Sequence, residues 1–230
     1  MTYLSFLSLF LLPVLIVVSC IFFKTYNKNK FRLKGIIILV LIAVIYTTPW
    51  DSFIIKNEIW YYDENKILGT IFRIPIEEYL FMIVQTLISS MLYCIVQKNK
   101  IVESFSYSPK YLILFGIIFF IGVMMIRVEY FKYFGYLITW ASIPLAIQWS
   151  IGSNQLISSF KKWLLSFILF SIYLSFIDCI AIKNNVWTIA ESTSCGINLF
   201  GLPIEELVFF LLTNLLVFQG MTLWDVLKND

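Results

Sequence analysis

The sequence predicts an all-α polytopic membrane protein with about seven transmembrane helices. Of its 230 residues, 60% are hydrophobic and only 13% are charged, whereas a soluble domain has about 25% charged residues. The mean hydropathy is +0.86. Several apolar segments approach or reach the roughly 20 residues that a helix needs to cross the hydrocarbon core of a bilayer. We therefore expect the chain to fold in a lipid bilayer rather than in water.

Seven apolar segments predict the individual membrane spans. The first has no basic residues before its apolar run, so we expect a retained span rather than a cleaved signal peptide. Arg127, Glu129 and Lys132 interrupt a long apolar stretch and predict a tight turn between two spans. The predicted spans are 3–23, 34–50, 76–97, 111–127, 131–149, 162–181 and 203–222.

The distribution of basic residues predicts the orientation in a cell membrane. The connections after the first, third and fifth spans carry Lys24, Lys28, Lys30, Arg32, Lys34, Lys98, Lys100, Lys110, Lys161 and Lys162. Connections rich in Lys and Arg stay in the cytoplasm. The N-terminus is therefore expected outside and the C-terminus in the cytoplasm. A net charge of +3, scattered in this way, does not indicate a nucleic-acid partner.

A duplicated pattern is the strongest signal in the sequence. The segment DSFIIKNEIW begins at Asp51, and the related segment DCIAIKNNVW begins at Asp178. Each is followed by the tetrapeptide PIEE, which begins at Pro75 in the first copy and at Pro203 in the second. Two ordered motifs at nearly constant separation indicate an internal repeat.

The repeat predicts how the chain is organised. We expect a first three-helix repeat within residues 1–100, one connecting span within 101–130, and a second three-helix repeat within 131–230. Three crossings alone would invert the second copy, whereas a fourth crossing between the copies makes the repeats parallel. Both PIEE motifs are therefore expected at the same membrane face, which the predicted orientation makes the outer one.

The glutamates of the PIEE motifs, Glu77, Glu78, Glu205 and Glu206, are candidate acid–base groups. Proline is favoured where a helix begins, so each motif predicts the start of a membrane helix. Adjacent helical residues point about 100° apart, so one glutamate of each pair can face the bundle interior. The glutamates could simply complement the helix dipole among lipid headgroups. Their repetition favours function, because ionisable groups at membrane depth are costly.

Two aspartates and two tryptophans recur beside the glutamates. Asp51 and Asp178 could be additional acids, or anchors for nearby lysines (Lys56 and Lys183) or backbone amides, and the anchor is favoured. Trp60 and Trp187 could belong to the aromatic belt at the membrane surface or stabilise a cation with their ring faces. The belt is slightly favoured.

Several residues and motifs that would indicate a metal or cofactor site are missing from the sequence. The chain has no histidine and no GxGxxG, DDxxD, P-loop or HExxH pattern. Its four cysteines form no CxxC pair. We therefore expect neither a metal nor a cofactor, and proton transfer must depend mainly on carboxyl groups.

The doubled segment resembles the small membrane lycopene cyclases, which occur as two subunits in some bacteria and as fused chains in archaea, other bacteria and fungi. Their signature is P-x-E-E at the start of a membrane helix. The resemblance implies non-redox, proton-initiated cyclisation of the linear ends of lycopene or a related carotenoid, usually to β-rings. It implies catalytic roles for Glu77, Glu78, Glu205, Glu206, Asp51 and Asp178, and substrate contacts from Trp60, Trp187, Pro75 and Pro203.

Two other functions remain open at this stage. A small proton-coupled transporter could also combine parallel repeats with buried carboxylates. A noncatalytic membrane scaffold would tolerate the loss of all four motif glutamates. The expected partners are a linear carotenoid, the lipid bilayer and, in some settings, other carotenoid enzymes.

Overall fold

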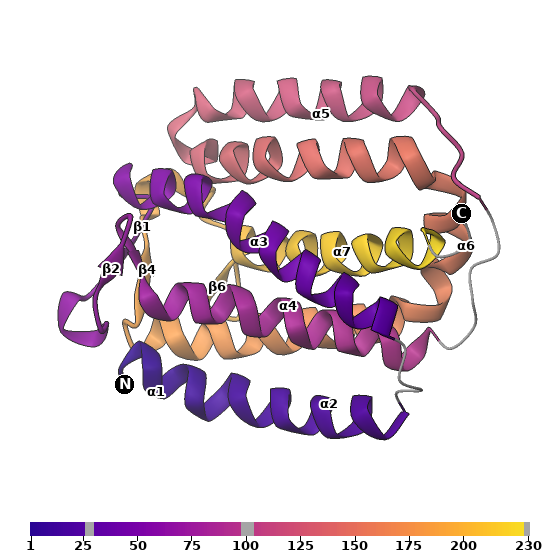
Figure 1. Ribbon diagram of the computed structural model, residues 1–230. Helices are drawn as coiled ribbons and strands as arrows, with labels where there is room; N and C mark the ends of the chain where they lie inside the picture. The colour runs from indigo at the N-terminus through magenta and orange to yellow at the C-terminus, as the bar shows by residue number, and fades with distance from the viewer. Residues whose placement is uncertain (26–29, 98–103, 228–230) are drawn as a thin grey trace.

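The computed structural model describes residues 1–25, 30–97 and 104–227 and is mostly helical (Figure 1). The helices are α1 (Tyr3–Phe6), α2 (Leu12–Thr25), α3 (Lys30–Lys56), α4 (Ile76–Val96), α5 (Lys110–Ile126), α6 (Lys132–Lys183) and α7 (Ile204–Val226). A π-helical segment, Leu7–Leu11, joins α1 to α2. The short strands are β1 (Trp60–Tyr62), β2 (Thr70–Ile71), β3 (Ile74–Pro75), β4 (Trp187–Ile189), β5 (Asn198–Leu199) and β6 (Leu202–Pro203).

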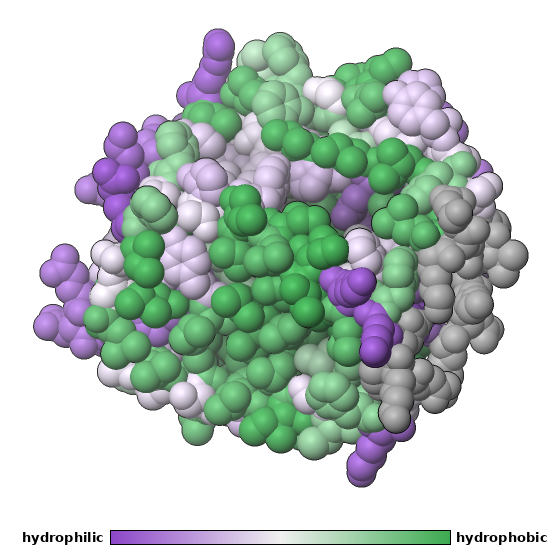
Figure 2. Space-filling view, viewed as in Figure 1, coloured by the Kyte–Doolittle hydropathy of each residue, from purple (hydrophilic) through white to green (hydrophobic). Residues whose placement is uncertain are grey.

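Five helical stretches are long and apolar enough to cross a membrane. They are Tyr3–Thr25, Lys30–Lys56, Ile76–Val96, Glu129–Lys183 and Ile204–Val226, and α5 is a shorter apolar helix. Large apolar side chains are exposed along these helices, as expected where lipid replaces water. Figure 2 shows this as a broad hydrophobic surface, with hydrophilic groups mainly toward the edges of the view.

The break between α5 and α6 agrees with the turn predicted at Arg127, Glu129 and Lys132. Helix α5 ends at Ile126, a 3₁₀ turn covers Glu129–Phe131, and α6 begins at Lys132. The connection predicted between residues 149 and 162 is much shorter than expected, because the break falls at one residue within it and the residues on either side are helical. The two expected spans are thus joined in one 52-residue element.

Helix α6 is interrupted at a single residue. Gly152 has φ −150° and ψ 32°, which is not helical. A straight helix of this length would extend about 78 Å, far beyond one bilayer. Figure 1 instead shows the earlier part beside α5 and the later part in a lower row that ends at β4. A Cβ atom at this position would overlap Leu223 Cδ2, so a larger residue would displace this leucine side chain of α7.

The same order of local elements follows both duplicated aspartates. After α3 and after α6 come a residue with positive φ (Glu58, 55°, and Asn185, 49°), a short strand, a 3₁₀ turn, a two-stranded hairpin and a helix that begins at PIEE. Strands β1 and β4 pair antiparallel, with Tyr61 opposite Thr188. The two connections therefore meet at one end of the helices.

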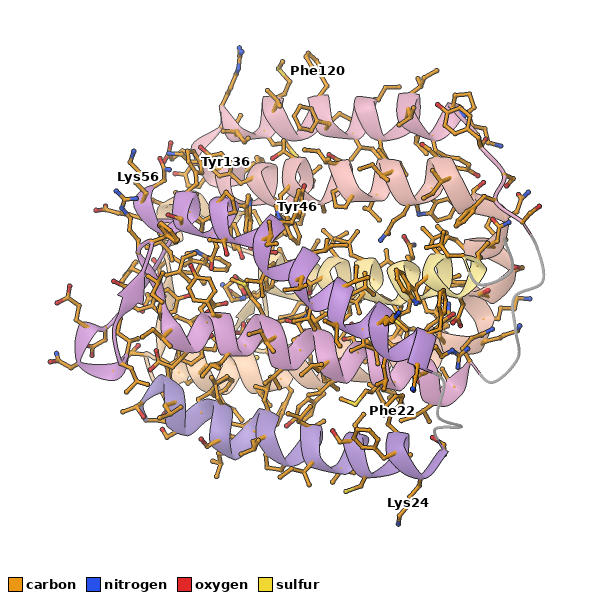
Figure 3. All side chains as sticks on the ribbon, in the orientation of Figure 1. Phe22, Lys24, Tyr46, Lys56, Phe120 and Tyr136 are labelled. Atoms are coloured by element: carbon orange, nitrogen blue, oxygen red, sulfur yellow. The ribbon has the colours of Figure 1, made fainter. Side chains whose placement is uncertain are left out.

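Several predictions about organisation remain untested. Lys28, Lys98, Lys100 and the boundary between residues 100 and 101 lie outside the described residues. Lys24, in the connection after the first predicted span, and Lys56, in the connection after the second, lie at opposite ends of the molecule (Figure 3). The three predicted units and the orientation in the membrane stay predictions.

Candidate active site

The four motif glutamates are buried at the starts of α4 and α7. Pro75 and Pro203 are the N-cap residues of these helices, with φ −54° and −55°. They therefore lie one residue before the first turn, and each also pairs within a hairpin. Neither proline lines the cavities described below, so the structure gives no support to their predicted substrate contacts.

The first glutamate of each motif faces the connection that precedes it. Glu77 Oε1 accepts a hydrogen bond from the backbone N–H of Leu68 at 2.8 Å. Glu205 Oε1 accepts one from the N–H of Cys195 at 2.7 Å, and its Oε2 accepts one from the hydroxyl of Ser194 at 3.0 Å. These carboxyl groups hold each connection against the helix that follows it.

The second glutamate of each motif faces tyrosines from distant parts of the chain. The hydroxyls of Tyr3 and Tyr62 both donate to Glu78 Oε2, at 2.5 and 2.9 Å. The hydroxyl of Tyr133 donates to Glu206 Oε1 at 2.6 Å. Burial, and then the nearby Glu78 charge, raises the pKa of Tyr62 well above its usual value. Its phenol is therefore protonated at neutral pH and able to donate.

Sequence reasoning missed these tyrosines, although two of them left a signal. Tyr3 and Tyr133 stand at the starts of the spans predicted to match, 3–23 and 131–149. An alignment of the repeats extended to this point would have paired them. Tyr62 left no such signal, because Ile189 is its counterpart in the second copy.

The two aspartates have different surroundings, although each is only 1% exposed. Trp187 Nε1 donates to Asp178 Oδ1 at 2.9 Å. Among the described residues, neither oxygen of Asp51 has a hydrogen-bond partner. The predicted lysine anchors are wrong, since neither aspartate forms an ion pair within the described chain. Each lysine follows its aspartate by five positions, which places it about 140° away around the helix.

The predicted tryptophan belt is also wrong. Trp60 and Trp187 are 5% and 7% exposed. The Trp60 ring lies 5.8 Å from Phe209 at 90°, and the Trp187 ring lies 4.9 Å from Tyr3. Because β1 pairs with β4, both connections fold over the helix ends and direct these indoles inward.

Two cavities meet at this cluster. A small central cavity is lined by side chains from both copies, including Glu78, Glu206, Asp178, Trp60, Trp187 and Phe209. A larger cavity is lined by Asp51, Glu78 and Trp60 at one end and by mostly apolar side chains beyond them. Glu78, Trp60 and Phe209 line both cavities. Within the described ranges, no cluster of three or more histidine, cysteine or acidic side chains is arranged to hold a metal ion.

The fold and the site together define a helical protein with membrane-length apolar helices and a buried cluster of carboxyl groups, phenols and aromatic rings. The sequence profile of the family described as "Lycopene cyclase" matches residues 1–96 and 132–224. The chain therefore belongs to the lycopene cyclase family. The two matched ranges leave out the segment that contains α5.

Individual relatives agree with this assignment. The chain is 33% identical to the lycopene beta-cyclase of Halobacterium salinarum, over 97% of this chain and 95% of the relative. It is 33% identical to the bifunctional lycopene cyclase/phytoene synthase of Arthroderma gypseum and 35% identical to that of Leptosphaeria maculans. Those alignments cover 84% and 86% of this chain but only 36% and 37% of the fungal proteins. No solved structure matches the chain.

Proposed function

We propose that this protein cyclises the linear ends of lycopene into β-rings, producing γ-carotene and β-carotene. Membership of the lycopene cyclase family supports this activity over the transporter and the scaffold. The observation that carries the proposal is the burial of Glu78, Glu206 and Asp178 around one cavity walled by tryptophan and phenylalanine rings. An all-hydrocarbon substrate offers only its double bonds to such a site, and carboxyl groups supply the proton that they require.

The reaction needs an acid, a base and protection from water. A carboxyl group donates a proton to the terminal double bond, which leaves a tertiary carbocation. The electron pair of the neighbouring double bond then forms the ring bond, and the ring cation loses a proton to a carboxylate. One proton is gained and one is lost, so no electrons enter or leave. The apolar cavities exclude the water that would otherwise capture the cation.

The aromatic side chains suit this cationic pathway. The faces of tryptophan and phenylalanine rings attract positive charge. Trp60, Trp187 and Phe209 line the central cavity, and we assign them to cation stabilisation. Glu77 and Glu205 are assigned to holding the connections through the hydrogen bonds described above, and Tyr3 and Tyr133 to positioning the second glutamates.

We further propose seven membrane crossings in two parallel three-helix repeats, with α5 as the connecting span. The interruption of α6 at Gly152 supports two crossings within that element. The recurrence of strand, turn, hairpin and helix supports the repeat. The N-terminus would lie outside the cell and the C-terminus in the cytoplasm, following the basic residues. Interaction with other carotenoid enzymes stays a prediction from the sequence.

The test is to express the chain in bacterial cells that accumulate lycopene and to separate the pigments by chromatography. We expect cyclic carotenoids from the wild type and none from Glu78→Gln at equal membrane abundance. Glu64→Gln is the matched control, because Glu64 is an exposed acid in the connection before the same motif. Unchanged lycopene with a well-expressed wild type would refute the proposed activity.

A further inference from the structure

The two halves of the acid cluster differ in ways that the repeat does not predict. We infer that the first half, Asp51 with Glu78, performs the proton transfers of cyclisation, and that Asp178 and Glu206 chiefly complete the wall of the chamber. This inference rests on the proposed cyclase function and specifies which acids act.

The first difference is in the partners of the aspartates. In the second half, the indole N–H of Trp187 donates to Asp178. In the first half, the matching indole N–H of Trp60 has no partner, and both carboxyl oxygens of Asp51 are equally unpartnered among the described residues. A buried polar group without a partner costs free energy, and such groups in native structures call for an explanation. An acid that must meet a substrate rather than a protein donor provides one.

The second difference is in access. Asp51 and Glu78 line the larger cavity, whereas Asp178 and Glu206 line only the central one. The larger cavity extends along α3 from Asp51 back to Leu39, which is 12 residues or about 18 Å at 1.5 Å per residue. An elongated, mostly apolar cavity of this kind is suited to one end of a linear polyene, with the terminal double bond beside the acids.

The entrance to the larger cavity faces the region where lipid would lie. Ile42 lines this cavity and is 54% exposed. Beside it, Tyr46 on α3 donates to the carbonyl of Trp140 at 2.7 Å, which closes the wall between α3 and the earlier part of α6. Figure 3 shows Tyr46 between these two helices. A carotenoid dissolved in the bilayer could therefore enter along α3 without crossing water.

The third difference is in the donors around the second glutamates. Among the side chains that the structure describes, Glu78 accepts from two phenols, Tyr3 and Tyr62, whereas Glu206 accepts from one, Tyr133. Hydrogen bonds to the charged form of a carboxyl group stabilise that form. These donors stabilise Glu78 as an anion more than Glu206. Asp51 has no donor within the described ranges, so burying it costs less free energy in its neutral form.

These differences divide the chemistry between two residues. Neutral Asp51 gives its proton to the terminal double bond, the ring bond forms from the neighbouring double bond, and ionised Glu78 takes the proton that the ring cation releases. Transfer of that proton from Glu78 back to Asp51 restores the starting state. The sum is an isomerisation that needs no oxidant, reductant or further reactant.

The test compares matched variants in lycopene-accumulating cells, with ring formation normalised to folded protein in the detergent-extracted membrane fraction. Asp51→Asn is expected to lower ring formation at least about 100-fold, the scale of general acid catalysis. Asp178→Asn is expected to lower it by less than about 10-fold. Lycopene that co-purifies with Asp51→Asn would show that binding survives while chemistry is lost.

A second pair keeps the test decisive if Asp51→Asn does not fold. Glu78→Gln is then expected to lose at least tenfold more activity than Glu206→Gln. Equal losses within the pairs, or larger losses at Asp178 or Glu206, would overturn the inference while leaving the cyclase function intact. A wild type that forms no rings would instead overturn the proposed function itself.

Discussion

A paired replacement of the two recurring tryptophans measures the asymmetry of the site directly. Trp187→Phe removes the indole N–H that donates to Asp178 Oδ1 at 2.9 Å. Trp60→Phe removes an N–H that has no partner within the described chain. Both changes exchange a buried indole for a smaller aromatic ring, so the loss of packing is similar in the two variants.

The magnitude of the difference follows from the hydrogen bond. Leaving a buried acceptor unsatisfied costs about 1–3 kcal/mol. The other oxygen of Asp178, Oδ2, already has no partner among the described residues, so no second bond compensates for the loss. Trp187→Phe should therefore be less stable than Trp60→Phe by about 1–3 kcal/mol, or about 5- to 150-fold in the ratio of folded to unfolded protein.

The assay is reversible unfolding of both purified variants in the same mixed micelles, followed by far-ultraviolet circular dichroism as denaturing detergent is added. Helical signal is preferred to fluorescence because each variant has lost a tryptophan. Phe209→Leu, which changes a neighbouring ring without removing the hydrogen bond of Asp178, reports the cost of packing alone. Equal stabilities for the two tryptophan variants, or a less stable Trp60→Phe, would refute the reasoning.

Three further predictions concern the scaffold. Gly152→Ala would place a methyl group against the Leu223 side chain of α7 and should destabilise the protein by about 1–3 kcal/mol. Gly116→Ala, which meets nothing within 4 Å, is the control for thermal unfolding. Arg32→Met removes the ion pair of buried Asp225, in which Nη2 and Oδ2 lie 2.6 Å apart. The free energy of unfolding should fall by about 3–5 kcal/mol. The double variant Arg32→Met with Asp225→Leu should recover most of this loss in the same assay. Burial and the neighbouring Glu78 charge raise the pKa of Tyr62 in the folded protein above the usual tyrosine pKa of about 10. The neutral phenol therefore contributes fully to stability below pH 10, and this contribution is lost as the pH rises from there through the pKa of the folded protein. Tyr62→Phe should therefore lose less stability than the wild type above pH 10 in alkaline unfolding, and an identical decline would contradict this.

Local patterns in the sequence were sufficient to predict the class of protein and the ends of several helices. Apolar segments of membrane length predicted the helices, and charged residues predicted the break before Lys132. The PIEE motifs predicted helix starts that the structure has at Ile76 and Ile204. Each of these features depends on residues close together in the chain, where composition and proline geometry decide the outcome.

Predictions that depended on distant contacts were less successful. The interface belt proposed for Trp60 and Trp187 failed because β1 pairs with β4, which lies more than a hundred residues away in the chain. The connection expected between residues 149 and 162 proved to be a break at one glycine within α6. Neither outcome is visible in hydropathy, since both depend on which surfaces meet.

The sequence by itself determined the membrane class, the doubled motif and the set of carboxyl groups from which a site could be built. Only the tertiary structure decided that Glu78 and Glu206 face a shared cavity while Glu77 and Glu205 hold backbone amides. It also decided that Tyr3 reaches Glu78 across 75 positions of the chain. The physical reason is that a repeat encodes which residues recur, whereas hydrogen-bond partners and access to a cavity depend on how separate helices pack.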